Sequence, residues 1–344
     1  MMRVFTKTIR IICLASLVWL AIANAFGQVS FVEHRGKITM LNREGKTVIK
    51  FKKNKDSWVI DDFKDGWGRI RVNGKVGLAD ENGWIVKPQK KAELFLHDGF
   101  YVLRYIDKVG VKTRDGKWLL EPTKRVYDWY GCDKVLPIKY DGKFGIMDKT
   151  GWIVEPTYDE MEWYSEDMLP VRKGRLWGFF DEEGRLAIKP QFKAVRRFNE
   201  GLAGVVIDHK WGFIDKTGEI VIAPAYDNID CFFEGLAAVE VDGLWGFIDK
   251  NGEMAIEPRF RAVGIFSEGL AAFVIDASGW GYMDTSGNVV IKPQFDGANP
   301  FDESGRAMVR IGDYETGVIG YVDRNGVFTT DETENNTIDA EVDE

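Results

Sequence analysis

The strongest constraint on the fold is a unit of about 35 residues that recurs along most of the chain. Each unit carries two glycines six residues apart, and successive units begin 33 to 39 residues after one another. The first glycines of the units are Gly77, Gly110, Gly145, Gly178, Gly212, Gly246, Gly281 and Gly320. A degenerate ninth unit precedes them, in which Gly45 keeps the second glycine and Thr39 replaces the first. Such regular spacing indicates a tandem-repeat architecture.

Each unit is predicted to fold as three or four short antiparallel strands. In residues 235–258 the runs LAAVEVD, LWGFID and EMAIEP are separated by turn residues, including the sequence DKNG. Asp opens a type I turn, and Gly takes the left-handed position that follows it. The proline that closes seven of the units, as at Pro258, cannot donate a ladder hydrogen bond, so it belongs at a strand end or on a sheet edge. Because no window has a helical period, the predicted fold class is all-β, built from antiparallel meander or hairpin repeats.

The first strand of a unit is apolar on both faces. In the run LAGVVID of residues 202–208, Leu202 and Val206 lie on one face, whereas Ala203, Val205 and Ile207 lie on the other. A strand covered on both faces needs neighbours on both sides, and a unit of about 35 residues cannot supply them alone. We therefore expect eight or nine units to stack and to bury one another's apolar surfaces. An open superhelical array is favoured by the uneven intervals, and a closed propeller-like ring is the alternative.

The two ends of the chain differ from the repeat region. Residues 1–25 have the pattern of a signal peptide, with three basic residues, an uncharged apolar run and the small-x-small sequence Ala23-Asn24-Ala25. Residues 331–344 carry seven carboxylates and no basic residue, and they are expected to form a solvated, disordered tail. The predicted organisation is therefore a signal peptide over 1–25, a repeat domain over 26–330 and an acidic tail over 331–344. This organisation predicts export to the periplasm or the extracellular space, with no membrane span once the signal is removed.

Charge and cysteine content exclude some classes of function. Loss of the three basic residues of the signal lowers the net charge from −8 to −11, and the tail accounts for seven of these charges. A nearly neutral repeat body does not offer the basic surface that nucleic acid requires. Cys132 and Cys231 remain after cleavage, about three repeats apart and at non-equivalent positions, so we expect two separate thiols and no disulfide-built fold.

Residues suited to catalysis or metal binding are sparse. His34, His97 and His209 fall in different units and form no metal-ligand spacing. No nucleophile elbow, phosphate-binding loop or dinucleotide fingerprint is present. We therefore expect no enzyme activity, no cofactor and no metal. The recurrent aspartates resemble calcium ligands, but each turn offers too few oxygens, and capping of the turn is the favoured interpretation; they include Asp181, Asp215, Asp249 and Asp284.

The recurrent tryptophans allow two interpretations. Trp177, Trp211, Trp245 and Trp280 each precede the first glycine of a unit. They pack between stacked units in the favoured interpretation, and they form an exposed ladder for sugar rings in the other. In the second case these four tryptophans are the ligand-binding residues.

These features resemble those of the WG-repeat family, which is named for its Trp-Gly pair. The pairs Trp177-Gly178, Trp211-Gly212, Trp245-Gly246 and Trp280-Gly281 match it, each followed by an aromatic residue, an apolar residue and Asp. The resemblance runs from about residue 38 to 330. The N-terminal half departs from it, because Val76, Val109 and Phe144 replace Trp, while Trp84 and Trp152 follow the second glycine. The resemblance implies a bacterial β-rich repeat protein with an interaction role.

The sequence therefore predicts a non-catalytic, exported repeat protein that binds a protein partner over an extended surface. A cell-envelope protein that binds carbohydrate or peptidoglycan by aromatic stacking is the alternative.

Overall fold

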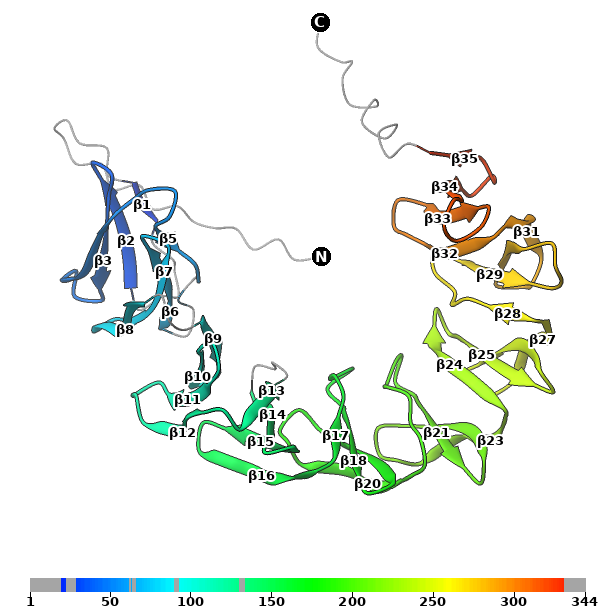
Figure 1. Ribbon diagram of the computed structural model, residues 1–344, viewed down its shortest axis with the longest axis horizontal. Coiled ribbons are helices and arrows are strands. Elements are labelled where there is room, and N and C mark those ends of the chain that lie inside the picture. The colour runs from blue at the N-terminus through cyan, green and yellow to red at the C-terminus, as the bar shows by residue number, and fades with distance from the viewer. Residues whose placement is uncertain are drawn as a thin grey trace, which may run out of the picture. The chain divides into compact units, whose positions relative to one another are not determined.

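The computed structural model describes residues 20–22, 29–61, 63, 66–89, 93–129 and 134–330. Within these ranges the chain contains strands and turns but no helix, and the strands form nine antiparallel sheets (Figure 1). No helix of the described residues is therefore available to cross a membrane. The all-β prediction and the count of eight or nine units are confirmed.

The chain divides into two compact units, Met1–Thr157 and Tyr158–Glu344. Unit 1 holds four sheets of four strands each, and within each sheet consecutive strands are neighbours. The first two sheets consist of β1 (Leu20–Ile22), β2 (Val29–His34), β3 (Lys37–Asn42) and β4 (Thr47–Lys52), and of β5 (Trp58–Val59), β6 (Trp67–Val72), β7 (Lys75–Asp80) and β8 (Gly83–Gln89). The next two consist of β9 (Glu93–His97), β10 (Phe100–Arg104), β11 (Val109–Thr113) and β12 (Trp118–Thr123), and of β13 (Val126–Trp129), β14 (Leu136–Tyr140), β15 (Lys143–Asp148) and β16 (Gly151–Tyr158).

Unit 2 holds the other five sheets. Its first two consist of β17 (Glu160–Met161), β18 (Leu169–Lys173), β19 (Leu176–Phe180) and β20 (Leu186–Phe192), and of β21 (Ala203–Ile207), β22 (Lys210–Ile214) and β23 (Ile220–Tyr226). The middle sheet consists of β24 (Asn228–Phe233), β25 (Leu236–Val241), β26 (Leu244–Asp249) and β27 (Met254–Phe260). The last two consist of β28 (Ala262–Val263), β29 (Leu270–Val274), β30 (Trp280–Asp284) and β31 (Val289–Phe295), and of β32 (Gly297–Phe301), β33 (Arg306–Ile311), β34 (Val318–Asp323) and β35 (Phe328–Thr329).

The hydrophobic core of unit 2 lies between neighbouring sheets. One cluster joins Phe213 and Ile222 of the sheet β21–β23 to Phe232 and Val239 of the sheet β24–β27. Three similar clusters join the other successive pairs of sheets in this unit. The expectation that the repeats bury one another's apolar surfaces is therefore confirmed for unit 2.

The first long strand of each repeat lies in the middle of this packing. Ala203, Gly204 and Val205 of β21 are all buried, as are Ala237, Ala238 and Val239 of β25. Alternate residues of a strand point to opposite faces, so burial of consecutive residues means that both faces are covered. Small residues at these positions allow the next sheet to approach closely.

The turn that follows the Trp-Gly strand also has the predicted chemistry. The second glycine of every repeat has a positive φ, from 74° at Gly45 and Gly184 to 126° at Gly151. Side chains rarely adopt this backbone conformation, which explains why glycine recurs there. In unit 2 the second glycines also lie close to the preceding sheet, since a Cβ on Gly252 or Gly287 would lie 3.1 Å from the side chain of Ile222 or Ile256, respectively.

Several predictions concern residues outside the described ranges. The signal peptide over 1–25 lies outside them except for β1, whose three residues pair with β2, and the acidic tail lies wholly outside them. The boundary between units 1 and 2 falls at the end of β16, within the predicted repeat domain. The choice between an open array and a closed ring stays a prediction, which small-angle X-ray scattering tests.

Candidate interaction surface

The glycine of each Trp-Gly pair lies against a bulge in the following strand. In the sheet β24–β27 the pairing of β26 with β27 shifts register between Trp245 and Phe247. A Cβ on Gly246 would lie 2.4 Å from the carbonyl oxygen of Ile256 and 2.7 Å from the nitrogen of Pro258. A Cβ on Gly178, Gly212 or Gly281 would lie 2.3, 2.6 or 2.6 Å, respectively, from the equivalent carbonyl oxygen. No side chain fits at these positions, so the glycine is a packing requirement of the strand pair.

Three of the four tryptophans of the motif lie at the margins of the inter-sheet clusters. All four are partly buried, and Trp211, Trp245 and Trp280 pack against the clusters between successive sheets. The guanidinium of Arg172 lies 5.8 Å from the ring centroid of Trp177, and that of Arg196 lies 5.4 Å from Trp211. The rings are thus neither fully enclosed nor fully exposed. Sugar stacking at these four residues stays a prediction.

The N-terminal repeats use tryptophan from another strand. The rings of Trp84, Trp118 and Trp152 lie 2.6 to 2.8 Å from the position that a Cβ would take on Gly77, Gly110 and Gly145. These rings therefore cover the first glycine from the last strand of the same repeat. The sequence showed that Trp84 and Trp152 stood at unusual positions, but it did not show what they contact.

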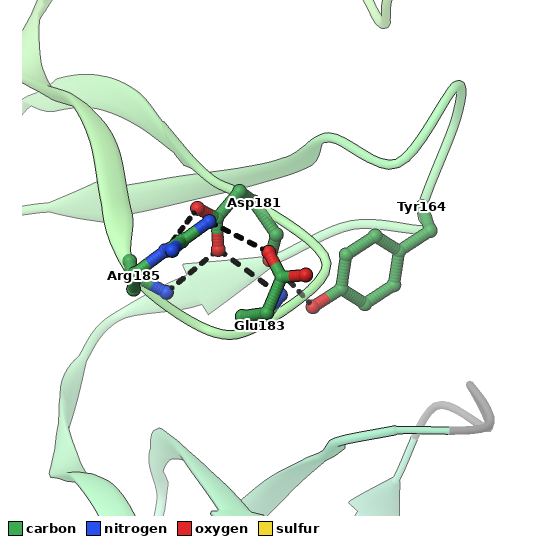
Figure 2. A network of polar contacts seen from close by, with 4 residues as sticks. All are labelled: Tyr164, Asp181, Glu183 and Arg185. Atoms are coloured by element: carbon green, nitrogen blue, oxygen red, sulfur yellow. Dashed lines mark hydrogen bonds and ion pairs between the residues drawn. The ribbon is translucent and has the colours of Figure 1, made fainter.

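The recurrent aspartates cap their own turns. Figure 2 shows Asp181, whose Oδ1 accepts hydrogen bonds from the backbone N–H groups of Glu183 (3.0 Å) and Arg185 (2.9 Å). The Arg185 side chain adds ion pairs to both carboxylates, at 2.7 Å to Asp181 and 2.8 Å to Glu183. The Tyr164 hydroxyl donates to the Asp181 carbonyl oxygen at 3.3 Å. Asp215, Asp249 and Asp284 accept the same pair of backbone hydrogen bonds in the following repeats.

These caps predict a loss of stability in acid. Hydrogen bonds, chiefly from the backbone N–H of Glu253 at Asp249 and from the side chain of Asn288 at Asp284, lower both pKa values below the ordinary 3.8. A carboxyl with a lowered folded pKa contributes stability above its unfolded pKa, and the contribution is lost as pH falls through the folded pKa. Urea unfolding should therefore show a falling free energy of unfolding below about pH 4. The double variant Asp249→Asn and Asp284→Asn should show a shallower fall, and an identical pH profile would contradict the assignment.

Among the described residues, the histidines and cysteines form no candidate metal site. His209 is exposed, with its Nε2 3.3 Å from the Lys193 ammonium. Cys231 is a buried free thiol whose pKa is raised by burial. Cys132 lies outside the described residues, so the expectation of two separate thiols stays a prediction. Over the described ranges, no group of three or more His, Cys, Asp or Glu residues could hold a metal ion.

Three glutamates accept hydrogen bonds from the following repeat, and these contacts were not predicted from the sequence. The carboxylate of Glu200 accepts a hydrogen bond from the backbone N–H of Gly235 at 3.0 Å, and Lys250 lies 3.0 Å from the same carboxylate. Glu166 and Glu234 accept equivalent bonds from the glycines 35 residues further on, Gly201 and Gly269, each at 2.9 Å. Glu166, Glu200 and Glu234 all have positive φ, a conformation that is costly for a non-glycine residue and is offset here by the bond to the next repeat.

A second feature that was not predicted from the sequence is a series of exposed apolar residues along unit 2. In the first four sheets of unit 2, apolar residues stand two and three positions after the second glycine, at the start of the last strand of the sheet. In four successive sheets they are Leu186, Ile220, Val221, Met254, Val289 and Val290, which we call the edge stripe. Their exposed fractions run from 36% at Met254 to 54% at Ile220. The sequence places three apolar residues in a row here, but only the third, such as Ile222 or Ile256, is buried.

One residue of the edge stripe, Ile220, lines a hollow of about 320 Å³ between the first two sheets of unit 2. Leu176 and Phe192 line it from one sheet, and Val206, Ile207 and Ile220 line it from the next. Lys193 and Asp208 add one charge of each sign. The hollow is therefore lined by both apolar and charged side chains.

A comparison of sequences decides the family. The profile described as "WG containing repeat" matches residues 144–177, 177–211, 211–245, 245–277 and 280–314, five consecutive repeats. The chain belongs to the WG-repeat family. These matches include the four Trp-Gly pairs and the edge stripe, and each match that begins at one of these pairs runs from one sheet of unit 2 into the next. No curated protein sequence shows significant similarity to the chain.

Solved structures show distant likeness to this WG-repeat chain. The crystal structure of a eukaryotic initiation factor shares 10% identity, over 85% of this chain and 92% of that one, with a TM-score of 0.43. The extracellular domain of BT4673 from B. thetaiotaomicron shares 13% identity over 89% and 58% of the two chains, with a TM-score of 0.35. BamB from Moraxella catarrhalis shares 11% over 90% and 98%, with a TM-score of 0.28. Likeness at this level carries no information about function.

Proposed function

We propose that the chain is a non-catalytic binding protein that recognises a protein partner through the edge stripe of unit 2. The observation that carries the proposal is the repetition of exposed apolar residues at the same two positions in four successive sheets. Apolar residues scattered singly on a surface are ordinary, whereas exposed apolar residues that gather into a patch mark an interaction site. Packing between the sheets does not require these residues, because the buried isoleucine beside them supplies the contact.

The position of the stripe favours an extended segment as the bound part of the partner. Strands β20, β23, β27 and β31 each stand at the end of their sheet's order, so one row of backbone N–H and C=O groups faces away from the sheet. An extended peptide can add to such an edge, with its backbone bonded to the strand and its side chains in apolar hollows. The prolines at 190, 224, 258 and 293 interrupt the row, so we expect short contacts, repeated from sheet to sheet, in place of one long strand.

We expect the proposed partner outside the cytoplasm, in the periplasm or the extracellular space, because residues 1–25 have the sequence pattern of a signal peptide. The alternative partner is a glycan that stacks on the tryptophans of the motif. Mutation can distinguish a protein partner from a glycan partner, because the edge stripe and the tryptophans of the motif consist of different residues of each repeat. Titration with peptidoglycan fragments should leave tryptophan fluorescence unchanged if the partner is a protein.

The double variant Ile220→Lys and Val221→Lys should reduce capture of the partner from a native envelope fraction by about tenfold or more, since a buried charge at an interface core is costly. The matched control is Ala223→Lys with Ala225→Lys, which adds the same charges at exposed positions of the same strand. Circular dichroism checks that both variants fold, and quantitative mass spectrometry measures the capture. Equal recovery with the stripe variant and the wild type would contradict the proposal, as would saturable quenching by a glycan.

A further inference from the structure

In three of the five sheets of unit 2, an aspartate binds the hairpin that follows the first long strand. The aspartate directly precedes the first strand of the sheet, and its carboxylate accepts a hydrogen bond from the backbone N–H of the first turn residue. These bonds run from Gly174 to Asp159 (2.6 Å), from Asp242 to Asp227 (3.1 Å) and from Gly312 to Asp296 (2.7 Å). The carboxylate thus satisfies a backbone donor that the strand pairing leaves free.

The second sheet of unit 2 lacks this carboxylate. Lys193 stands 34 residues before Asp227, in the equivalent position, and an ammonium donates hydrogen bonds but cannot accept them. The N–H of Asp208, the first turn residue of the hairpin between β21 and β22, has no acceptor among the described residues. In the fourth sheet Arg261 replaces the aspartate, but Asp276 caps that hairpin from within by accepting a backbone N–H at 2.8 Å. Of the five hairpins described in unit 2, that of the second sheet is therefore the one that no aspartate caps.

The same hairpin is strained at His209. Both of its turn residues have positive φ, 47° at Asp208 and 71° at His209. Hairpins of this type carry glycine at the second position elsewhere in the chain, as at Gly74 and Gly243, because other residues adopt this conformation at a cost. Such strain persists where the side chain has a role. Here the imidazole Nε2 lies 3.3 Å from the Lys193 ammonium and accepts its hydrogen bond, so His209 holds Lys193 beside the hairpin.

These polar groups adjoin the hollow between the first two sheets of unit 2. Lys193 and Asp208 line it, as do the apolar side chains of Phe192 and Ile207. The site therefore offers two donors to a carboxylate, the Lys193 ammonium and the Asp208 N–H. The Asp208 carboxylate adds an acceptor, which disfavours a stretch of acidic residues and favours a ligand that also carries an N–H. The C-terminal residue of a polypeptide has this combination on one Cα, namely a carboxylate, a backbone N–H and a side chain.

We propose that this site binds the C-terminal residue of a protein partner and that this residue has an apolar side chain. The terminal carboxylate occupies the place that the Asp227 carboxylate has in the next sheet, and it accepts hydrogen bonds from the Asp208 N–H and the Lys193 ammonium. The N–H of the terminal residue donates to the Asp208 carboxylate, and its side chain lies in the hollow, which Ile220 of the edge stripe also lines. The inference rests on the proposed function for the statement that the ligand belongs to a protein, whereas the chemistry of the site rests on the hairpin alone.

Titration of the ¹⁵N-labelled full chain with N-acetyl-leucine, followed by NMR, tests the site with a defined probe. This compound has a carboxylate, an N–H and an apolar side chain, as the C-terminal residue of a peptide has. The amide resonances of Asp208 and His209 should shift saturably. N-acetyl-leucinamide lacks the carboxylate and should bind about tenfold more weakly, because the charge-assisted hydrogen bonds to the site are lost.

Two variants return the hairpin to the form of its neighbours. Lys193→Asp supplies the carboxylate that the neighbouring sheets have, so it should fill the site and weaken binding of N-acetyl-leucine about tenfold without lowering the urea midpoint. His209→Gly should weaken binding about threefold, because the lysine side chain must then be ordered when the ligand binds. The matched control is Lys189→Asp, which makes the same change of charge at an exposed position of β20 and should leave the affinity unchanged.

Three results would overturn the proposal, namely no saturable shift of the Asp208 amide, equal affinity for the acid and its amide, or equal affinity of the wild type and Lys193→Asp. Acetyl-aspartyl-leucinamide has a side-chain carboxylate in place of the terminal one, and binding as tight as that of N-acetyl-leucine would overturn the assignment to a C-terminus. Failure here is distinct from failure of the proposed function. Loss of capture in the Ile220→Lys, Val221→Lys variant, without binding of N-acetyl-leucine, would reject the C-terminal site and leave the edge stripe in place.

Discussion

Replacement of Gly246 by alanine should lower the free energy of unfolding by about 3 kcal/mol or more. This is a large loss for an overpacking substitution. The new Cβ would lie 2.4 Å from the carbonyl oxygen of Ile256 and 2.7 Å from the nitrogen of Pro258. Both are backbone atoms of the bulged strand β27, so the clash is relieved only by moving that strand. Urea denaturation followed by circular dichroism measures the change.

The matched control is Gly264→Ala in the next repeat. A Cβ there would have its nearest contact at 3.5 Å, with the side chain of Ala272, which is ordinary van der Waals distance, and the backbone does not have a positive φ. We expect a change of less than about 0.5 kcal/mol for this control. If Gly246→Ala and Gly264→Ala cost the same, the bulge does not account for the glycine of the motif.

Truncation of either phenylalanine in the Phe213–Phe232 pair should cost about 3 to 5 kcal/mol, the usual range for loss of a fully buried ring. Both side chains are 0% exposed, and they belong to successive sheets, with ring centroids 4.9 Å apart. Phe213→Ala therefore removes part of the core of two repeats at once. As a control for loss of apolar surface alone, Ile220→Ala removes a side chain that is 54% exposed, and it should cost far less.

The double variant Phe213→Ala and Phe232→Ala tests whether the two sheets stabilise each other. Because the two rings contact each other, the combined loss should differ from the sum of the single losses by about 0.5 to 1.5 kcal/mol. Additive losses would mean that each ring is held by its own repeat, contrary to the packing between sheets.

Much of the architecture could be predicted because it depends on local backbone chemistry that repeats. An Asp followed three residues later by Gly requires a particular turn wherever it occurs, and Gly184, Gly218 and Gly252 all have the positive φ that this turn needs. Burial of both faces of the first strand could likewise be predicted, because the run LAGVVID has no polar face.

The features that could not be predicted depend on contacts between repeats or on strand irregularities. The bulge that excludes a side chain at Gly246 follows from the path of β27, which the sequence does not reveal. The hydrogen bond that the Gly235 N–H donates to the Glu200 carboxylate joins residues 35 positions apart. For the edge stripe, Ile220, Val221 and Ile222 are equally apolar in sequence, and only the pairing with β22 decides that Ile222 alone turns inward.

The central claim is that successive sheets form one another's core, and chains shortened one sheet at a time test it most directly. Chains that end after residues 330, 295 and 260 lose no sheet, one sheet and two sheets of unit 2. In a stacked array each removal takes away an interface as well as a sheet. We therefore predict that the urea midpoint falls at each step and that the newly terminal sheet becomes the fastest to exchange its amides. A constant midpoint, with unchanged protection in the sheets that remain, would contradict the claim.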